Sequence, residues 1–301
     1  MTKVLVTGGA GFIGSHLCEG LLARGYHVRV LDSLIYGRRE NMPAGVEFME
    51  GDIRELARCQ RAAEGMDGVF HCAAMSRAGP SQDLIDICTQ SNVTGTQNML
   101  LAARDAGVKR FIYSGSSTFY GNRPVPHREN DPSDLLNIYG LTKQVGEEYC
   151  LLFDRTSDLA CVVLRYFNVY GPRQPQTGAY ALVLGIFLNR RAENKVLEIH
   201  GGGVQQRDFV HVRDVVAANI AAFDRAEEKG IRGEIFNVGS GESISVKALA
   251  DMISPNQVHT PARQGDAAAT LADISKIKAR LGWSPKVSFA EGLKELITLP
   301  K

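Results

Sequence analysis

The glycine-rich stretch near the start of the chain constrains the fold more than any other segment. It follows a short apolar run at residues 4–6, which is typical of a buried parallel strand. Gly8, Gly11 and Gly14 then recur at every third position. Glycine permits a tight turn at Gly8, close approach of a phosphate at Gly11 and close helix packing at Gly14. We therefore expect a strand, a phosphate-binding turn and a helix that begins near Phe12.

An acidic residue completes this pattern. A second predicted strand ends at Asp32, eighteen residues after Gly14. A carboxylate at this distance can bind both hydroxyls of an adenosine ribose, and it would repel a 2′-phosphate. Strand, glycines, helix and acid together form a dinucleotide-binding fingerprint, whereas three glycines in an unrelated loop would lack this context. The sequence favours NAD as the cofactor, with NADP as the alternative because Arg38 and Arg39 follow.

Composition and charge exclude several classes of protein. The 301 residues include 34 basic and 33 acidic side chains, so a net charge of +1 draws the chain neither to nucleic acid nor to an anionic membrane. The N-terminus leads directly into a strand, and no apolar stretch reaches the ~18 residues of a membrane helix. None of the six cysteines forms a C-x-x-C pair, which indicates reduced core thiols and no metal site. We expect a cytoplasmic protein.

Strand and helix signals alternate through the first half of the chain. Besides the two strands above, apolar runs predict strands at residues 45–50, 68–71, 109–114 and 159–166. Amphipathic segments predict helices at 54–63, 83–106 and 136–156. Repeated β–α units with right-handed crossovers build a doubly wound parallel sheet, so the predicted fold class is α/β of the Rossmann type.

The second half of the chain predicts a smaller lobe that is interleaved with this sheet. Residues 168–173 and the next few are rich in glycine, proline and glutamine, which predicts a loop. Strands are predicted at 196–200 and 234–238, and helices at 180–190, 211–227, 245–253, 274–281 and 289–296. We expect a cofactor domain of residues 1–166, to which 204–239 return, and a C-terminal lobe of residues 167–203 and 240–301.

Two motifs carry side chains suited to catalysis. Tyr139 and Lys143 are four residues apart on a predicted helix, so they share one face. A free tyrosine has a pKa of ~10, and a nearby ammonium would favour its phenolate form as a general base. Ser114 to Thr118 follow the predicted fifth strand, at the edge where open α/β sheets bind ligands. Read singly, the first motif is a surface pair and the second a turn rich in hydroxyls.

Together these motifs resemble the extended short-chain dehydrogenase/reductase superfamily, and within it the NAD-dependent epimerase/dehydratase branch that acts on nucleotide sugars. The resemblance covers nearly the whole chain. Its further motifs are Gly51-Asp-Ile53, His71-Cys-Ala-Ala74, Asn92-Val-x-Gly-Thr96, Arg165 to Arg173, Gln206-Arg-Asp-Phe-Val210, Asn237-Val-Gly-Ser240 and Arg263-x-x-Asp266.

The resemblance implies a role for each matched residue. The implied catalytic residues are Ser116, Tyr139 and Lys143. The implied NAD-binding residues are Gly8, Gly11, Phe12, Ile13, Gly14, Asp32, Asp52, Ile53, Ala73, Ala74, Asn92, Ser114, Tyr139, Lys143 and Tyr166. The implied residues for the substrate, a UDP-sugar, are Ser116, Thr118, Tyr139, Asn168, Arg207, Arg263, Asp266 and Thr270. The implied assembly is a homodimer formed through the helices predicted at 83–106 and 136–156.

Local residues discriminate among the reactions of this branch. Its dehydratases carry an Asp-Glu pair after the catalytic threonine position, where this chain has Phe119 and Tyr120. Relatives that act on UDP-glucuronate often have Thr at the Asn168 position and an extra Arg where Pro175 stands. The remaining pattern is that of a UDP-hexose 4-epimerase for UDP-glucose and UDP-galactose. Thr270 stands where a bulky Tyr restricts the pocket, so 2-acetamido sugars are also expected as substrates.

Two alternatives stay open. A C4-oxidising relative, such as a UDP-glucuronate 4-epimerase, a decarboxylase or a reductase, would use the same three catalytic residues. A regulator that binds NAD without turnover belongs to a different class, and it has no need of Ser116, Tyr139 and Lys143 together.

Overall fold

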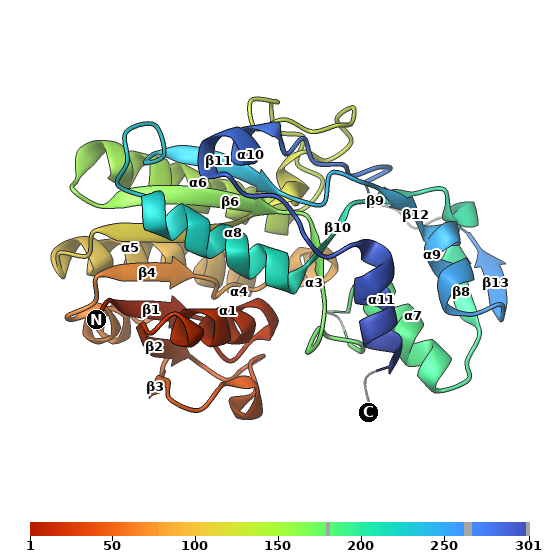
Figure 1. The fold of residues 1–301 in the computed structure, drawn as a ribbon, viewed down its shortest axis with the longest axis horizontal. Helices are drawn as coiled ribbons and strands as arrows, with labels where there is room; N and C mark the ends of the chain where they lie inside the picture. Colours follow the sequence, from red (N-terminus) through yellow and green to blue (C-terminus); the bar gives the residue numbers. More distant parts are fainter. Residues whose placement is uncertain (77, 179–180, 262–266, 299–301) are drawn as a thin grey trace.

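The structure is a computed structural model that describes residues 1–76, 78–178, 181–261 and 267–298. Its centre is a seven-stranded parallel sheet with the order β11-β6-β5-β4-β1-β2-β3 (Figure 1). The strands are β1 (Lys3–Thr7), β2 (His27–Asp32), β3 (Glu47–Glu50), β4 (Gly68–His71), β5 (Arg110–Ser116), β6 (Ala160–Tyr166) and β11 (Glu234–Val238). The order reverses between β1 and β4, and open α/β sheets bind ligands at such a switch point.

Helices cover both faces of this sheet. One face carries α1 (Phe12–Ala23), α8 (Val212–Arg225) and α10 (Ser275–Leu281), and the other carries α2 (Leu56–Ala63), α5 (Gly95–Asp105) and α6 (Ile138–Thr156). In β1, Val4 and Val6 pack into the first core and Leu5 into the second, because successive side chains point to opposite faces. A strand buried on both faces needs a continuous apolar run. The predicted doubly wound α/β fold is confirmed.

A smaller lobe with its own core lies beside the carboxyl ends of the strands (Figure 1). Its helices are α7 (Val183–Ala192), α9 (Val246–Ile253) and α11 (Phe289–Thr298). Its strand pairs are β8 (Leu197–His200) with β13 (Gln257–Thr260), β9 (Gln206–Arg207) with β12 (Ile244–Ser245), and β7 (Asn168–Tyr170) with β10 (Phe209–His211). Short 3₁₀ turns are η1 (Arg39–Asn41), η3 (Ser117–Phe119) and η4 (Gly201–Gly203). Across the described part of the chain, no helix is long and apolar enough to span a bilayer.

The structure corrects two predictions about secondary structure. The helix predicted at 83–106 begins later than expected and contains a π-turn: α4 (Ile85–Thr89), the π-turn η2 (Gln90–Thr94) and α5 follow one another without a gap. Leu84, with φ −119° and ψ 48°, separates this helix from α3 (Ala78–Asp83). The loop predicted at 168–173 begins with strand β7. This strand pairs in parallel with β10, a partner far along the chain that local composition cannot report.

Candidate active site

The glycine turn has the shape that its three glycines predicted. Gly8 has φ +72°, and a Cβ there would lie 2.8 Å from the backbone nitrogen of Ala73. A Cβ at Gly14 would collide with the carbonyl oxygen of Gly8. Gly11 is the N-cap of α1, and within this fully described helix no side chain caps the first turn and no acid lies in it. The free N–H groups at this helix N-terminus fit the pyrophosphate of a dinucleotide.

Two carboxylates lie near this turn. Asp32 ends β2, and its carboxylate accepts hydrogen bonds from the backbone N–H groups of Ala10 (2.9 Å) and Leu34 (2.8 Å), which hold it at the glycine turn. Asp52 forms an ion pair with Arg54 at 2.7 Å. Burial alone would raise the pKa of Asp52, but the hydrogen bonds and charge of Arg54 lower it below its ordinary value. Of these two carboxylates, Asp32 lies directly at the glycine turn, where the sequence pattern expects the ribose-binding acid.

The helix that carries Tyr139 and Lys143 begins at the carboxyl edge of the sheet. Asn137 caps α6 by accepting the N–H of Gly140 at 2.8 Å. A Cβ at Gly140 would lie 3.3 Å from the carbonyl oxygen of Thr118, so the first turn of α6 packs on the segment that follows β5. Tyr139 lies in this first turn and Lys143 one turn later. The helix motif therefore lies next to the hydroxyl-rich segment at the end of β5.

Lys143 lies in an unusual environment for a lysine. It is only 5% exposed, and its Nζ lies 4.1 Å from the centre of the Tyr113 ring, a cation–π contact. Burial lowers the pKa of Lys143 to about 8. The hydroxyl of Tyr113 donates to the carbonyl of Lys143 at 3.2 Å, and a Cβ at Gly146 would collide with the same hydroxyl. Tyr113 of β5 therefore sets the distance of α6 from the sheet.

Hydroxyl groups line the ends of β5 and β6. The Oγ of Ser116 accepts hydrogen bonds from the N–H (3.2 Å) and from the hydroxyl (2.9 Å) of Thr118. Ser114 Oγ lies 3.2 Å from the hydroxyl of Tyr166, which donates to Asn219 at 2.9 Å. Burial raises the pKa of Tyr166 well above its ordinary value. Tyr166 is therefore a neutral phenol that fixes Ser114, and it is no candidate base.

Of the residues that the sequence assigns to the sugar nucleotide, some lie in the described part of the chain and others do not. Asn168 donates from Nδ2 to the hydroxyl of Thr270 (3.2 Å) and to the carbonyl of Asp208 (2.9 Å), so these segments are bound together. Arg207 lies half-buried in β9. Two further assigned residues, Arg263 and Asp266, lie outside the described residues.

The sequence interpretation missed two buried polar groups beside the site. The carboxylate of Asp208 accepts hydrogen bonds from Ser240 (2.7 Å) and Ala272 (3.0 Å), and burial raises its pKa. Arg165 pairs with Glu147 through bonds of 2.9 and 2.5 Å and with the hydroxyl of Tyr120 at 2.8 Å. The sequence did carry a signal for this pair. Arg165 lies within the apolar run of β6, and a charged residue that is buried needs a partner of opposite charge.

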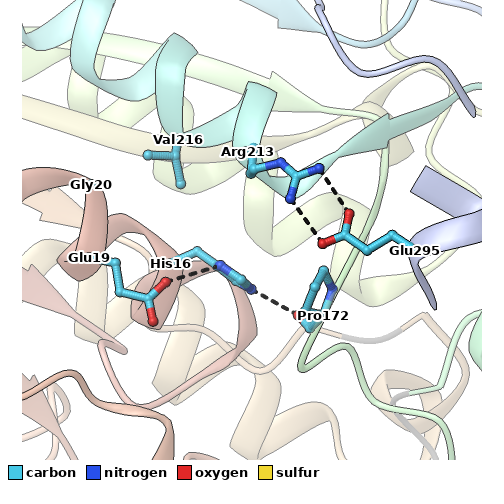
Figure 2. Close-up of a pocket in the computed structure, with 7 residues that line it drawn as sticks. All are labelled: His16, Glu19, Gly20, Pro172, Arg213, Val216 and Glu295. Carbon is cyan, nitrogen blue, oxygen red and sulfur yellow. Dashed lines mark hydrogen bonds and ion pairs between the residues drawn. The ribbon is translucent and has the colours of Figure 1, made fainter. Parts of the chain in front are cut away.

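Neither Tyr139 nor Lys143 lines the cavity of about 430 Å³ that Figure 2 shows. It is lined by His16, Glu19, Gly20, Pro172, Arg213, Val216 and Glu295. Its charges are already paired: Arg213 binds Glu295 through two bonds of 2.9 Å, and His16 lies 3.4 Å from Glu19 (Figure 2). These paired charges make the cavity a weaker candidate than the carboxyl edge of the sheet, which carries the buried Lys143. The fold and this edge define a Rossmann-type nucleotide-binding protein.

Comparison with known proteins identifies the family. Residues 4–239 match the NAD dependent epimerase/dehydratase family. A putative UDP-glucose 4-epimerase of Methanocaldococcus jannaschii is 35% identical over 99% of this chain and 98% of that protein. A UDP-N-acetyl-alpha-D-glucosaminuronate decarboxylase of Bacillus cytotoxicus is 33% identical over 98% and 96%. The crystal structure of Thermotoga maritima UDP-glucose 4-epimerase with UDP-glucose is 36% identical with a TM-score of 0.92, covering 98% and 97%. The chain belongs to the NAD-dependent epimerase/dehydratase family, and NAD is its cofactor.

Proposed function

We propose that this protein is a UDP-hexose 4-epimerase that oxidises C4 of the sugar to a ketone and reduces it again from the other face. One observation carries the proposal: the turn of α6 with Tyr139 packs on the segment after Ser116, and Lys143 is buried one turn away. A base, a hydroxyl donor and a cation would then lie together at the carboxyl edge of the sheet, the edge at which open α/β sheets bind ligands.

NAD would take the hydride from C4 and return it, and the chain would hold NAD along the ends of β1, β2 and β4. The glycine turn and the N-terminus of α1 suit the pyrophosphate, and Asp32 suits the adenosine ribose. The remaining proposed contacts are Asp52 and Ile53 at adenine, Ala73, Ala74 and Asn92 along the middle, and Ser114, Lys143 and Tyr166 at the nicotinamide end.

The hydrogen bonds of Ser116 define its role in this mechanism. Its oxygen already accepts two hydrogen bonds from Thr118, so its own proton is free to be donated. Ser116 would therefore donate a hydrogen bond to the 4-oxygen of the sugar or to the Tyr139 phenolate. Tyr139 would remove the 4-hydroxyl proton and later return it, while the Lys143 cation favours the phenolate.

The residues after Thr118 support epimerisation over dehydration. Elimination of water needs an acid and a base beside the sugar, and dehydratases of this branch supply an Asp-Glu pair at these positions. Phe119 and Tyr120 are both buried here, and the guanidinium carbon of Arg165 lies 3.6 Å from the centre of the Phe119 ring. These two side chains therefore support the sheet and offer no carboxylate to a sugar.

The smaller lobe is the proposed binding site for UDP. Arg207 and Arg263 would face its diphosphate, and Asn168 and Asp266 would complete the contacts, because charge-assisted hydrogen bonds suit this group. The proposed division is a cofactor domain of residues 1–166 with 204–239, and a nucleotide-sugar lobe of 167–203 and 240–301. The hydrogen bond from Asp208 to Thr270 joins the two parts, and that from Asn168 to Thr270 joins two segments of the lobe.

Product analysis tests the proposal directly. The purified protein is incubated with UDP-glucose, UDP-galactose, UDP-GlcNAc, UDP-GalNAc and UDP-glucuronate, and the sugar products are identified by NMR. A C4 epimer without net NAD turnover is the expected product. Release of CO₂ from UDP-glucuronate would support the decarboxylase alternative, as the Bacillus cytotoxicus relative suggests. No conversion of any sugar would support a regulator that binds NAD.

The size of Thr270 predicts which C2 substituents are accepted. Wild-type protein should convert UDP-GalNAc as well as UDP-galactose, and Thr270→Tyr should lose conversion of UDP-GalNAc first, because the larger ring fills the space of the acetamido group. The measurement is kcat/KM for both sugars. Thr270→Ser is the matched control, since it keeps the hydroxyl that binds Asn168 and Asp208. Equal loss of both sugars in Thr270→Tyr would contradict the pocket argument.

The buried Lys143 predicts opposite trends of activity and stability with pH. The rate should fall as pH rises through about 8, where Lys143 loses its proton and no longer favours the phenolate. The folded pKa lies below the unfolded value of ~10.4, so the unfolded chain binds more protons between these values and stability should rise over this window. Rate profiles and urea unfolding from pH 7 to about 10 test both trends. Lys143→Met should remove this gain in stability. If the free energy of unfolding of Lys143→Met still rises with pH as in the wild type, Lys143 is not the group responsible.

The proposal includes a homodimer. Large apolar side chains are exposed on the neighbouring helices α4 and α6 and beside them: Leu84, Ile85, Ile87, Leu141 and Leu152. Such a patch is typical of a self-association surface between copies. Light scattering should give the mass of a dimer, and Ile87→Lys with Leu152→Lys should give a monomer. Met252→Lys, an exposed apolar site in the lobe, is the control and should remain dimeric.

A further inference from the structure

A chain of buried hydrogen bonds runs behind the candidate active site through His71. The register of β1 and β4 pairs Thr7 with His71. The hydroxyl of Thr7 lies 2.9 Å from His71 Nδ1, and His71 Nε2 lies 3.1 Å from the hydroxyl of Thr96 in α5. Thr96 donates in turn to the backbone carbonyl of Asn92 at 2.7 Å. All four side chains are buried, so these bonds have no competition from bulk water.

The donors and acceptors in this series of hydrogen bonds indicate which ring nitrogen of His71 carries a proton. Thr96 uses its one proton for Asn92, so the bond between Thr96 and His71 needs a proton on Nε2. The oxygen of Thr7 accepts the N–H of Ala73 at 3.2 Å, and the Thr7 hydroxyl can donate to an unprotonated Nδ1. If Nδ1 carried a proton, Thr7 would have to accept from both Ala73 and His71, and its own proton would have no acceptor in this network. The hydrogen bonds therefore place a proton on Nε2 and favour a neutral His71.

The series of hydrogen bonds ends in the π-turn η2, which precedes α5. The N–H of Gly95 bonds to the carbonyl of Gln90, five residues back, and Asn92 lies within the turn. The side chain of Asn92 bonds to both backbone groups of Met75, at 2.8 and 3.0 Å. The segment that follows β4 and the start of α5 are therefore joined twice, through His71 and through Asn92.

The same network continues into the catalytic helix. Asn92 Nδ2 donates to Thr142 at 3.0 Å, and the hydroxyl of Thr142 donates to the carbonyl of Tyr139 at 2.9 Å. Hydrogen bonds thus connect Thr7, which precedes the glycine turn, with the turn of α6 that carries Tyr139.

The charge of His71 matters to Lys143. The His71 ring stacks on Tyr113 with centroids 6.0 Å apart, and Lys143 Nζ contacts the same Tyr113 ring. Among the described residues, Lys143 from α6 and Tyr113 from β5 are the titratable groups that face the imidazole. Burial and the charge of Lys143 lower the pKa of His71 to about 3. A second cation here would work against the charge that Lys143 needs.

We infer that His71 is a positioning residue: as a neutral imidazole held between Thr7 and Thr96, it couples the glycine turn to the helix that carries Tyr139 and Lys143. The expected effect on catalysis rests on the proposed epimerase function. The protonation state of His71 does not rest on that function. An experiment can therefore test the inference and the proposed function separately.

A matched pair of variants at Thr96 tests the coupling. Thr96→Val keeps the shape and removes the hydroxyl, whereas Thr96→Ser keeps the hydroxyl and removes a methyl group. Thr96→Val should lower kcat about tenfold, which corresponds to ~1.4 kcal/mol, with KM for the sugar nucleotide unchanged. Thr96→Ser should restore kcat to near the wild-type value. A wild-type kcat in Thr96→Val, or an equal loss in both variants, would overturn the inference.

The tautomer is measured independently of turnover. Holoenzyme with ¹⁵N-labelled histidine is studied by NMR, and the His71 signals are assigned by their absence in His71→Gln. We expect a proton on Nε2, none on Nδ1, and no titration near ~6.5, the pKa of an ordinary imidazole. A proton on Nδ1, or titration in that range, overturns the inference even if the enzyme converts sugars. Failure to convert any sugar, with the expected tautomer present, would instead overturn the proposed function.

Discussion

Replacing Tyr139 with phenylalanine should lower kcat of the proposed epimerisation at least ~100-fold, the usual scale for a positioned acid–base group. The change removes only the phenolic oxygen, so α6 keeps its cap at Asn137 and Lys143 keeps its contact with Tyr113. The measurement is steady-state conversion of UDP-galactose by the holoenzyme, with the NAD content of each preparation determined after denaturation. Loss of kcat with full NAD content would identify Tyr139 as the proton acceptor.

The same helix supplies a control for this experiment. Tyr149 lies on α6 and packs, half-buried, against the core on that face of the sheet. Tyr149→Phe removes an identical atom far from the first turn, so it should keep the wild-type kcat. If Tyr139→Phe is as active as Tyr149→Phe, another group is the base and the proposed mechanism is wrong.

Replacing Glu147 with glutamine should destabilise the fold by about 3–5 kcal/mol, because it leaves the Arg165 cation buried without its partner. The two side chains are 2% and 4% exposed, and two hydrogen bonds join them between α6 and β6. Surface ion pairs contribute only about 0–1 kcal/mol, so burial decides the size of this effect. The measurement is the free energy of unfolding in urea.

The neighbouring residue provides the matched control for Glu147. Glu148 is exposed on the same helix, so Glu148→Gln should change stability by less than ~0.5 kcal/mol. The double variant Glu147→Leu with Arg165→Met should recover part of the loss, because it removes both buried charges. Equal stabilities of Glu147→Gln and Glu148→Gln would show that the pair is not buried in solution.

Local sequence patterns predicted most of the fold. The apolar run of β1 and the glycines after it specify strand, turn and helix through contacts between near neighbours in the chain. The strands predicted at 68–71 and 234–238 correspond to β4 and β11. The same local reasoning selected Tyr139 and Lys143, because a spacing of four on a helix places two side chains on one face.

Elements that depend on distant partners could not be predicted in this way. Strand β7 has three residues before Gly171 and Pro172, and it becomes a strand because β10 pairs with it. The π-turn within the helix predicted at 83–106 has a similar cause. Asn92 bonds to the backbone of Met75, and the π-turn accommodates that contact. In both cases the stabilising hydrogen bonds join residues that are far apart in the chain.

The sequence by itself determined the dinucleotide-binding turn, the parallel sheet and the placement of Tyr139 and Lys143 one turn apart on a helix, because each depends on residue types at short spacing. Only the tertiary structure decided which buried polar groups meet: Arg165 with Glu147, Asp208 with Ser240, and His71 with its two threonines. A polar side chain in an apolar segment shows that a partner is needed. The folded chain alone selects that partner, since its position depends on how the helices and strands pack.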